Sequence, residues 1–272
     1  MRATHGALAL VVLIAAGSAA RAQEYPSAAP VPRTTSIPAL HAIARGREVH
    51  ERFVRGISDE QRGQWSAAAS EFERIIVLHP NEPQYSTAHY DLGIAYANLK
   101  RFDDSAHQFE EALTGDPGFL AAMANLIAVD LARGNLTQAR AIADRFVKAA
   151  PDSARALYSR GIIGLRTGDV LAARNDFSQL LRNDPQYAVA HYNLGIAQTR
   201  LHDYSSAERE FSVALDLAPA YARARFALGT VLLREGKRTQ ARDAFERVVR
   251  DANGDPALQN LALAMRDAIH AP

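Results

Sequence analysis

The chain contains 272 residues but no cysteine and a single tryptophan, and its formal net charge is only +1. The absence of cysteine excludes disulfides and thiolate metal sites, so the fold must be held together by packing alone. A charge balance this close to zero gives no reason to expect a nucleic-acid partner, because such binding requires a basic stripe with stacking aromatic residues.

Catalytic constellations are also missing. Nine histidines are present, but there is no HExxH motif and no cluster of His, Asp and Glu at ligand spacing. His89 and His191 begin two nearly identical segments that are far apart in the chain, and we predict a structural role for both. The glycine-rich run Gly161–Gly168 is not followed by Lys-Ser or Lys-Thr and lies inside an expected helix pair, which argues against a phosphate-binding loop. We therefore expect no catalytic residues, no metal site and no small-molecule cofactor.

What the sequence does contain is a repeat. From Ser86 to Asp255 the same pattern recurs five times with a constant period of 34 residues. A small residue is followed four places later by an aromatic or apolar one, at Ser105/Phe109, Ala139/Ala143, Ala173/Phe177, Ala207/Phe211 and Ala241/Phe245. A glycine recurs upstream at Gly93, Gly161, Gly195 and Gly229, with Ile127 in its place in the third copy. A sixth copy, offset by three residues, precedes these with Gly56, Ala68 and Phe72.

A unit of this length with this internal pattern resembles the tetratricopeptide repeat (TPR). The resemblance implies an all-α, right-handed superhelical solenoid of about six helix–turn–helix repeats. The predicted repeats span residues 49–82, 86–119, 120–153, 154–187, 188–221 and 222–255, and residues 256–272 form a capping helix. In that last helix we expect Leu258, Leu261, Ala262 and Met265 to face the array.

The turns inside the repeats have their own signature. Four of them place a glycine where a left-handed backbone is expected, at Gly63, Gly134, Gly168 and Gly236. Lys100 and His202 take that position in the other two repeats, so these two turns should be less favourable.

The N-terminal residues have the pattern of an export signal. Residues 1–22 combine Arg2, a short apolar core and the small-x-small sequence Ala20-Arg21-Ala22, which predicts cleavage after Ala22. An uncleaved membrane anchor is the alternative. Residues 23–48 form a linker with Pro26, Pro30, Pro32 and Pro38 that we expect to be extended, leading into a helix from about Ala39. The expected location is the periplasm or the outside of a bacterial cell.

The TPR resemblance further implies that the first helix of each repeat lines a concave groove. One row there reads Phe53, Tyr90, Ala124, Tyr158, Tyr192 and Phe226, and the next reads Ile57, Ile94, Ala128, Ile162, Ile196 and Thr230. Five arginines border these rows in the last three repeats, at Arg155, Arg166, Arg200, Arg223 and Arg234. We predict the binding groove at Tyr158, Ile162, Tyr192, Ile196, Phe226 and these arginines. The alternative is that the tyrosines only pack and the arginines are plain surface.

These features predict a protein–protein interaction scaffold of the bacterial cell envelope, which binds a partner peptide or helix that carries apolar anchors and acidic side chains. One alternative is a self-assembling structural protein. Residues 49–153 contain 10 Lys/Arg and 15 Asp/Glu, a balance of −5, whereas residues 154–255 contain 15 and 12, a balance of +3. Another alternative is an accessory subunit of an envelope enzyme or secretion complex.

Overall fold

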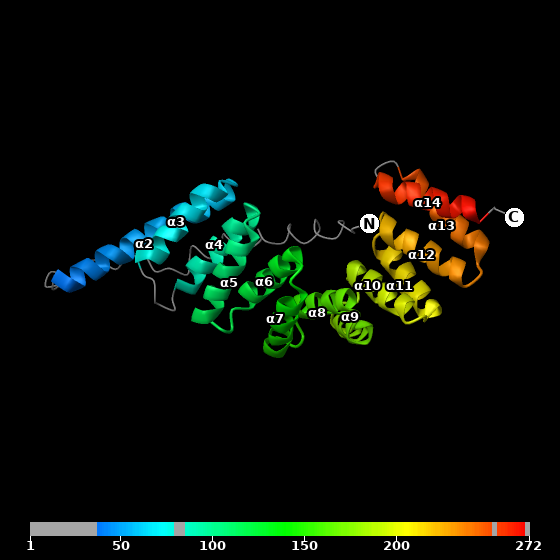
Figure 1. The fold of residues 1–272 in the computed structure, drawn as a ribbon, viewed down its shortest axis with the longest axis horizontal. Coiled ribbons are helices and arrows are strands. Elements are labelled where there is room, and N and C mark those ends of the chain that lie inside the picture. The colour runs from blue at the N-terminus through cyan, green and yellow to red at the C-terminus, as the bar shows by residue number, and fades with distance from the viewer. Residues whose placement is uncertain (1–36, 79–84, 252–254, 270–272) are drawn as a thin grey trace. The chain divides into compact units, whose positions relative to one another are not determined.

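A computed structural model describes residues 37–78, 85–251 and 255–269, and every element within these ranges is a helix (Figure 1). The helices are α2 (Ile37–Gln61), α3 (Trp65–Leu78), α4 (Ser86–Asn98), α5 (Phe102–Gly115), α6 (Leu120–Arg133), α7 (Leu136–Ala149), α8 (Ala154–Thr167), α9 (Val170–Asn183), α10 (Ala188–Arg200), α11 (Tyr204–Leu217), α12 (Ala222–Arg234), α13 (Arg238–Arg250) and α14 (Pro256–Ala268). The predicted leader and most of the proline-rich linker lie outside the described residues. None of the described helices is long and apolar enough to span a membrane.

The helices pack in sequential pairs, and the chain divides into two compact units, residues 1–149 and 150–272. In the first unit α2/α3, α4/α5 and α6/α7 form pairs, and the second helix of one pair packs on the first helix of the next. The second unit repeats this arrangement with α8/α9, α10/α11 and α12/α13, followed by α14. First helices of successive pairs also touch, as α10 does with both α8 and α12. This packing confirms the predicted all-α solenoid of six helix pairs.

The turns within the pairs have the predicted left-handed backbone. Gly63, Gly134, Gly168 and Gly236 have φ values of 70°, 79°, 88° and 78°. Lys100 and His202 adopt the same conformation, with φ values of 60° and 62°. Because this region is unfavourable for residues with a Cβ, these two turns are strained where the others are not.

A close contact between glycine and phenylalanine closes each helix pair except the third. A Cβ added to Gly93 would lie 2.7 Å from the ring of Phe109, and the same separation applies to Gly195 and Phe211. The third pair reverses the sizes of the two residues, with Ile127 at the glycine position and Ala143 at the phenylalanine position. Both side chains are buried, with Ile127 at 1% exposure and Ala143 at 0%. The exchange keeps the volume between the helices filled, which protein cores require.

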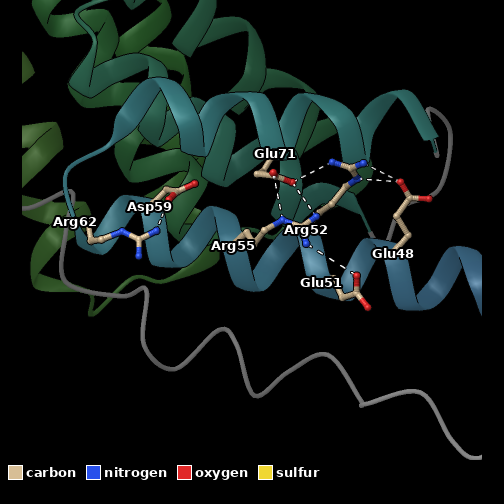
Figure 2. A network of polar contacts seen from close by, with 7 residues as sticks. All are labelled: Glu48, Glu51, Arg52, Arg55, Asp59, Arg62 and Glu71. Carbon is tan, nitrogen blue, oxygen red and sulfur yellow. Dashed lines mark hydrogen bonds and ion pairs between the residues drawn. The ribbon is translucent and has the colours of Figure 1, made fainter.

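The first helix begins earlier than predicted. α2 starts at Ile37, so Pro38 lies in its first turn and not in the extended linker. Proline is tolerated there because the first N–H groups of a helix have no partner within the helix. Figure 2 shows how polar side chains join α2 to α3: Arg52 and Arg55 on α2 both bind Glu71 on α3, at 3.1 and 3.3 Å.

The last helix, α14, covers the end of the array, but fewer of its side chains face the array than predicted. Asp255 caps its N-terminus by accepting a hydrogen bond from the Ala257 amide. Ala262 is buried, and Leu258, Met265 and Ile269 pack against the core residues around Phe245. Leu261, which we expected on this face, is 50% exposed. Among the described helices α14 packs mainly on α13, with fewer contacts to α12, so one helical stripe is covered and Leu261 lies beside it.

Candidate functional site

The candidate site lies on the first helices of the second unit. Tyr158 on α8, Tyr192 on α10 and Phe226 on α12 occupy equivalent positions one period apart, and all three are half-buried. Each ring packs against the phenylalanine of its own second helix. The centroid distances are 6.1 Å for Tyr158–Phe177, 5.9 Å for Tyr192–Phe211 and 5.4 Å for Phe226–Phe245. The core therefore fixes these rings, while part of each ring stays at the surface.

Two further tyrosines, which the sequence reading missed, complete an aromatic group on this face. Tyr187 and Tyr221 immediately precede α10 and α12. Tyr187 stacks on Tyr158, with centroids 5.8 Å apart and planes at 27°, and Tyr221 contacts Tyr192 at 5.0 Å. We call Tyr158, Tyr187, Tyr192 and Tyr221 the tyrosine cluster. The 34-residue spacing between Tyr187 and Tyr221 could have identified these residues, but the prediction considered only the faces of the helices.

The hydroxyl groups of the cluster differ in their partners. The Asn193 side-chain amide donates to the Tyr158 hydroxyl at 3.5 Å, and in the first unit Asn125 donates to Tyr90 at 3.1 Å. In both cases the asparagine follows the tyrosine by 35 residues. The residue 35 places after Tyr192 is Ala227, which has no side-chain donor.

Burial keeps the hydroxyls of the cluster protonated. It raises the pKa of Tyr158 to about 12, and it also raises the pKa of Tyr187, Tyr192 and Tyr221 above the ordinary value. Arg223 opposes this effect at Tyr192 and Tyr221, so its guanidinium lies within electrostatic range of both hydroxyls. At neutral pH these groups therefore present O–H donors on an otherwise apolar surface.

The second predicted row is aliphatic at the surface. Ile162 on α8 and Ile196 on α10 are half-buried and pack against the core residues around Phe177. Thr230 on α12 is also half-buried, and its hydroxyl donates to the backbone carbonyl of Phe226 at 3.1 Å. The three side chains thus extend the apolar strip formed by the aromatic row.

The five predicted arginines are all exposed, but they do not have the same role. Arg200 donates a hydrogen bond to the backbone carbonyl of Leu165, in the last turn of α8. A cation at this position satisfies one of the terminal carbonyl groups of a helix, so Arg200 links α10 to α8. Arg223 and Arg234 form no hydrogen bond or ion pair with any residue that the structure describes. Arg155 and Arg166 are the other two of the five predicted arginines.

The side chains of the equivalent rows in the first unit are more deeply buried. Phe53, Tyr90, Ile57 and Ile94 are buried, at exposures of 2–5%. The third pair contributes Ala124, which is buried, and Ala128, which is half-buried. We therefore place the candidate face in the second unit.

The two similar histidines connect the helices of their own pairs. The Nδ1 atom of His89 lies 2.8 Å from Gln108 Oε1, and that of His191 lies 2.6 Å from Glu210 Oε2. The other ring nitrogen of His191 lies 3.0 Å from the Pro185 carbonyl oxygen. These contacts support the predicted structural role. Within the described ranges, no three His, Asp or Glu residues are grouped so that they could hold a metal ion.

Comparison with solved structures supports the fold. A tetratricopeptide repeat protein from Parabacteroides merdae is 15% identical, with a TM-score of 0.69 over 83% of this chain and 94% of that one. YrrB, a TPR protein with an unusual peptide-binding site, is 14% identical, with a TM-score of 0.60 over 74% of this chain and all of that one. MamA from Desulfovibrio magneticus is 22% identical, with a TM-score of 0.59 over 64% of this chain and 97% of that one.

Sequence comparison gives the family. No curated protein matches the chain. The family model for the tetratricopeptide repeat matches residues 53–118, 129–188, 165–221 and 192–256. These matches cover well over half of the sequence and run through both units. The chain belongs to the tetratricopeptide repeat family.

Proposed function

We propose that this protein is an interaction scaffold, which binds a peptide segment of a partner protein on the first-helix face of the second unit. The observation that carries the proposal is the strip of half-exposed aromatic and aliphatic side chains along α8, α10 and α12, bordered by exposed arginines. Apolar anchors of a peptide would pack on the strip, and its acidic side chains would pair with guanidinium groups, which bind carboxylates through two donors.

The packing of this face favours binding without rearrangement. Tyr158, Tyr192 and Phe226 are each fixed by a phenylalanine of the core, and Tyr187 and Tyr221 are fixed by ring contacts. A surface that is already ordered loses little side-chain entropy on association. The similarity in fold to YrrB, which has a peptide-binding site, is in keeping with this use of the repeats.

The cell envelope is the proposed location. The support comes from the predicted leader at residues 1–22, with cleavage after Ala22, which would export the repeats to the periplasm or the outside of the cell. N-terminal sequencing of the protein purified from the envelope fraction would give Gln23 as the first residue. Recovery of the full chain from the cytosol would overturn this part of the proposal.

Site-specific photo-crosslinking tests the binding face. A photoreactive residue at Ile196 or Thr230 should capture a partner, whereas one at Asn175 on α9 or Asp243 on α13, both exposed on second helices, should not. The captured protein is then purified, and its affinity for the scaffold is measured by calorimetry. Equal capture from both sets of positions, or from the second helices alone, would contradict the proposed face.

Self-association is the second candidate function, because the charge balance differs between the two parts of the repeat region. Oppositely charged surfaces would attract in low salt and would be screened in high salt. Light scattering over a range of protein and salt concentrations separates the two functions. A particle mass that grows with concentration and falls in high salt would favour self-association, and a constant monomer mass would exclude it.

A further inference from the structure

We propose that Arg223, together with the hydroxyl groups of Tyr192 and Tyr221, forms a subsite for a carboxylate of the bound peptide. This inference rests on the proposed function and adds to it the position and the chemistry of one ligand group. The occupant is an acidic side chain, located beside an apolar anchor that packs on Tyr192 and Phe226.

The hydroxyl groups of Tyr192 and Tyr221 have no partner among the described residues. The Tyr158 hydroxyl accepts a hydrogen bond from Asn193, whereas Ala227, the residue at the equivalent position for Tyr192, has no side-chain donor. Neither the Tyr192 nor the Tyr221 hydroxyl forms a hydrogen bond with any residue that the structure describes. Both groups remain protonated at neutral pH, so both are available as donors to a ligand.

Arg223 is a cation without a partner in the described part of the protein. Neighbouring basic groups are already engaged: Arg225 donates to the Pro219 carbonyl at 2.5 Å, and Lys237 pairs with Glu208 at 2.5 Å. Arg223 is exposed in the first turn of α12 and forms no hydrogen bond or ion pair within the described ranges. Arg223 follows Tyr221 by two residues, the Tyr221 ring contacts that of Tyr192, and the guanidinium lies within electrostatic range of both hydroxyls.

The two tyrosine side chains of the subsite are held in place before a ligand arrives. Tyr192 packs on Phe211 at 5.9 Å, and Tyr221 packs on Tyr192 at 5.0 Å. One positive charge with two neutral donors matches a carboxylate, which has a single charge and two acceptor oxygens.

Among the described residues of the second unit, this combination occurs once. One repeat earlier, Tyr158 and Tyr187 form the same ring contact, but the residue equivalent to Arg223 is Val189. Arg155 has the equivalent position on α8, where Ser153 stands in place of the preceding tyrosine. Only at α12 do an arginine and two tyrosines without hydroxyl partners come together.

A charge-reversal selection tests the subsite. A displayed library of random dodecapeptides is selected against the wild-type protein and against Arg223→Glu. We expect the wild type to select an Asp or Glu next to an aromatic or aliphatic residue, and the variant to select Lys or Arg at the same place. Selection of the same sequences by both proteins would overturn the subsite but leave the binding face intact. Failure of the wild type to select any peptide would count against the proposed function itself.

Matched substitutions refine the test, with the selected peptide as the probe. Tyr192→Phe and Tyr221→Phe should each weaken binding about tenfold, the effect of losing one hydrogen bond to a charged group. Tyr204→Phe removes a hydroxyl from α11, a second helix outside the proposed face, and should leave the affinity unchanged. Replacing the acidic residue of the peptide by its amide should abolish the effect of Tyr192→Phe. Unchanged affinity in Tyr192→Phe and Tyr221→Phe would show that the rings merely pack, and would overturn the proposal. An equal loss in Tyr204→Phe would overturn it as well.

A gain-of-function variant provides an independent check. Val189→Arg would place a guanidinium beside Tyr158 and Tyr187, one repeat before Arg223. We expect this variant to select peptides with a second acidic residue, while its melting temperature stays that of the wild type. Unchanged selection would mean that a cation beside two tyrosines does not create a carboxylate subsite.

Discussion

Arg160 on α8 holds Asp176 on α9 through two parallel hydrogen bonds, Nη2 to Oδ1 at 2.6 Å and Nε to Oδ2 at 2.9 Å. The Asp176 side chain is 5% exposed and that of Arg160 is 27% exposed. A bidentate pair of this kind is stronger than a surface ion pair, because both carboxylate oxygens are matched by donors in a partly desolvated place. It joins the two helices of the pair that begins the second unit.

Breaking this pair should destabilise the second unit. We expect Asp176→Ala to lower the free energy of unfolding by about 2–3 kcal/mol, since it removes two hydrogen bonds between charged groups from a partly desolvated place. Urea unfolding followed by circular dichroism measures the change. Asp243→Ala is the control: its contact with Arg242 is exposed and 3.5 Å long, so its loss should cost less than about 0.5 kcal/mol. Equal effects of the two substitutions would contradict the difference in strength.

The reversed sizes of Ile127 and Ala143 predict a strongly coupled pair. Ile127→Gly should open a cavity and Ala143→Phe should crowd a filled space, each lowering the free energy of unfolding by about 2 kcal/mol or more. The double variant restores the glycine–phenylalanine arrangement of the other five pairs and should lose less than the sum of the two single changes. A double-mutant cycle measures the coupling. Additive losses would show that the two residues do not share one space.

Asp130 predicts a dependence of stability on pH. Its side chain is fully buried, and desolvation raises its pKa to about 6, although Arg133 opposes this shift. Because the pKa in the folded state exceeds that of an unfolded chain, about 3.9, the folded state binds the proton more tightly. The stabilisation is therefore complete below about pH 4 and is lost as the pH rises through about 6.

Asp130→Asn isolates this effect from other groups that titrate in the same range. The asparagine variant should lack the fall in unfolding free energy between pH 4 and 7, and the difference between the two proteins should reach at most about 3 kcal/mol. Urea unfolding at a series of pH values provides the measurement. A pH profile that is identical in both proteins would show that Asp130 keeps an ordinary affinity for its proton.

The left-handed turns at Lys100 and His202 predict two stabilising substitutions. Lys100→Gly should raise the free energy of unfolding by about 0.5–1 kcal/mol, because it removes the strain of a Cβ at positive φ. His202→Gly should gain less, since His202 Nδ1 also contacts the Tyr204 hydroxyl at 3.0 Å. In the opposite direction, Gly134→Ala should destabilise the third turn. Thermal melts compare the three variants, and a loss of stability in Lys100→Gly would contradict the strain argument.

The sequence allowed the repeats and the turns to be predicted because both follow from local patterns. The helix pairs follow from residues such as Ala173 and Phe177 that recur at a fixed period, and the turns follow from Gly168 and its equivalents. The contact of Arg200 with the Leu165 carbonyl could not be predicted in this way. Its acceptor is a backbone atom, which every residue has, so no residue type in the sequence marks it.

The composition of the candidate face was predicted only in part. Ile162, Ile196 and Tyr192 lie on the first helices, where the helical period places them on one side. Tyr187 and Tyr221 precede those helices, so their contacts depend on the path of a loop and not on a helical period. The exposure of Leu261 also lay beyond sequence reasoning, because it depends on how many neighbours cover α14.

The aromatic contacts of the candidate face show where the chain can be divided into complete 34-residue units. Tyr192, Phe211 and Tyr221 all fall within residues 188–221, so one period of sequence contains a complete group of three contacting rings. The preceding period, residues 154–187, contains Tyr158, Phe177 and Tyr187 in the same way. A segment that begins and ends at these borders, when duplicated in tandem, would carry its own complete part of the proposed binding face. Gene duplication in steps of one period would therefore lengthen the array and the proposed binding face together.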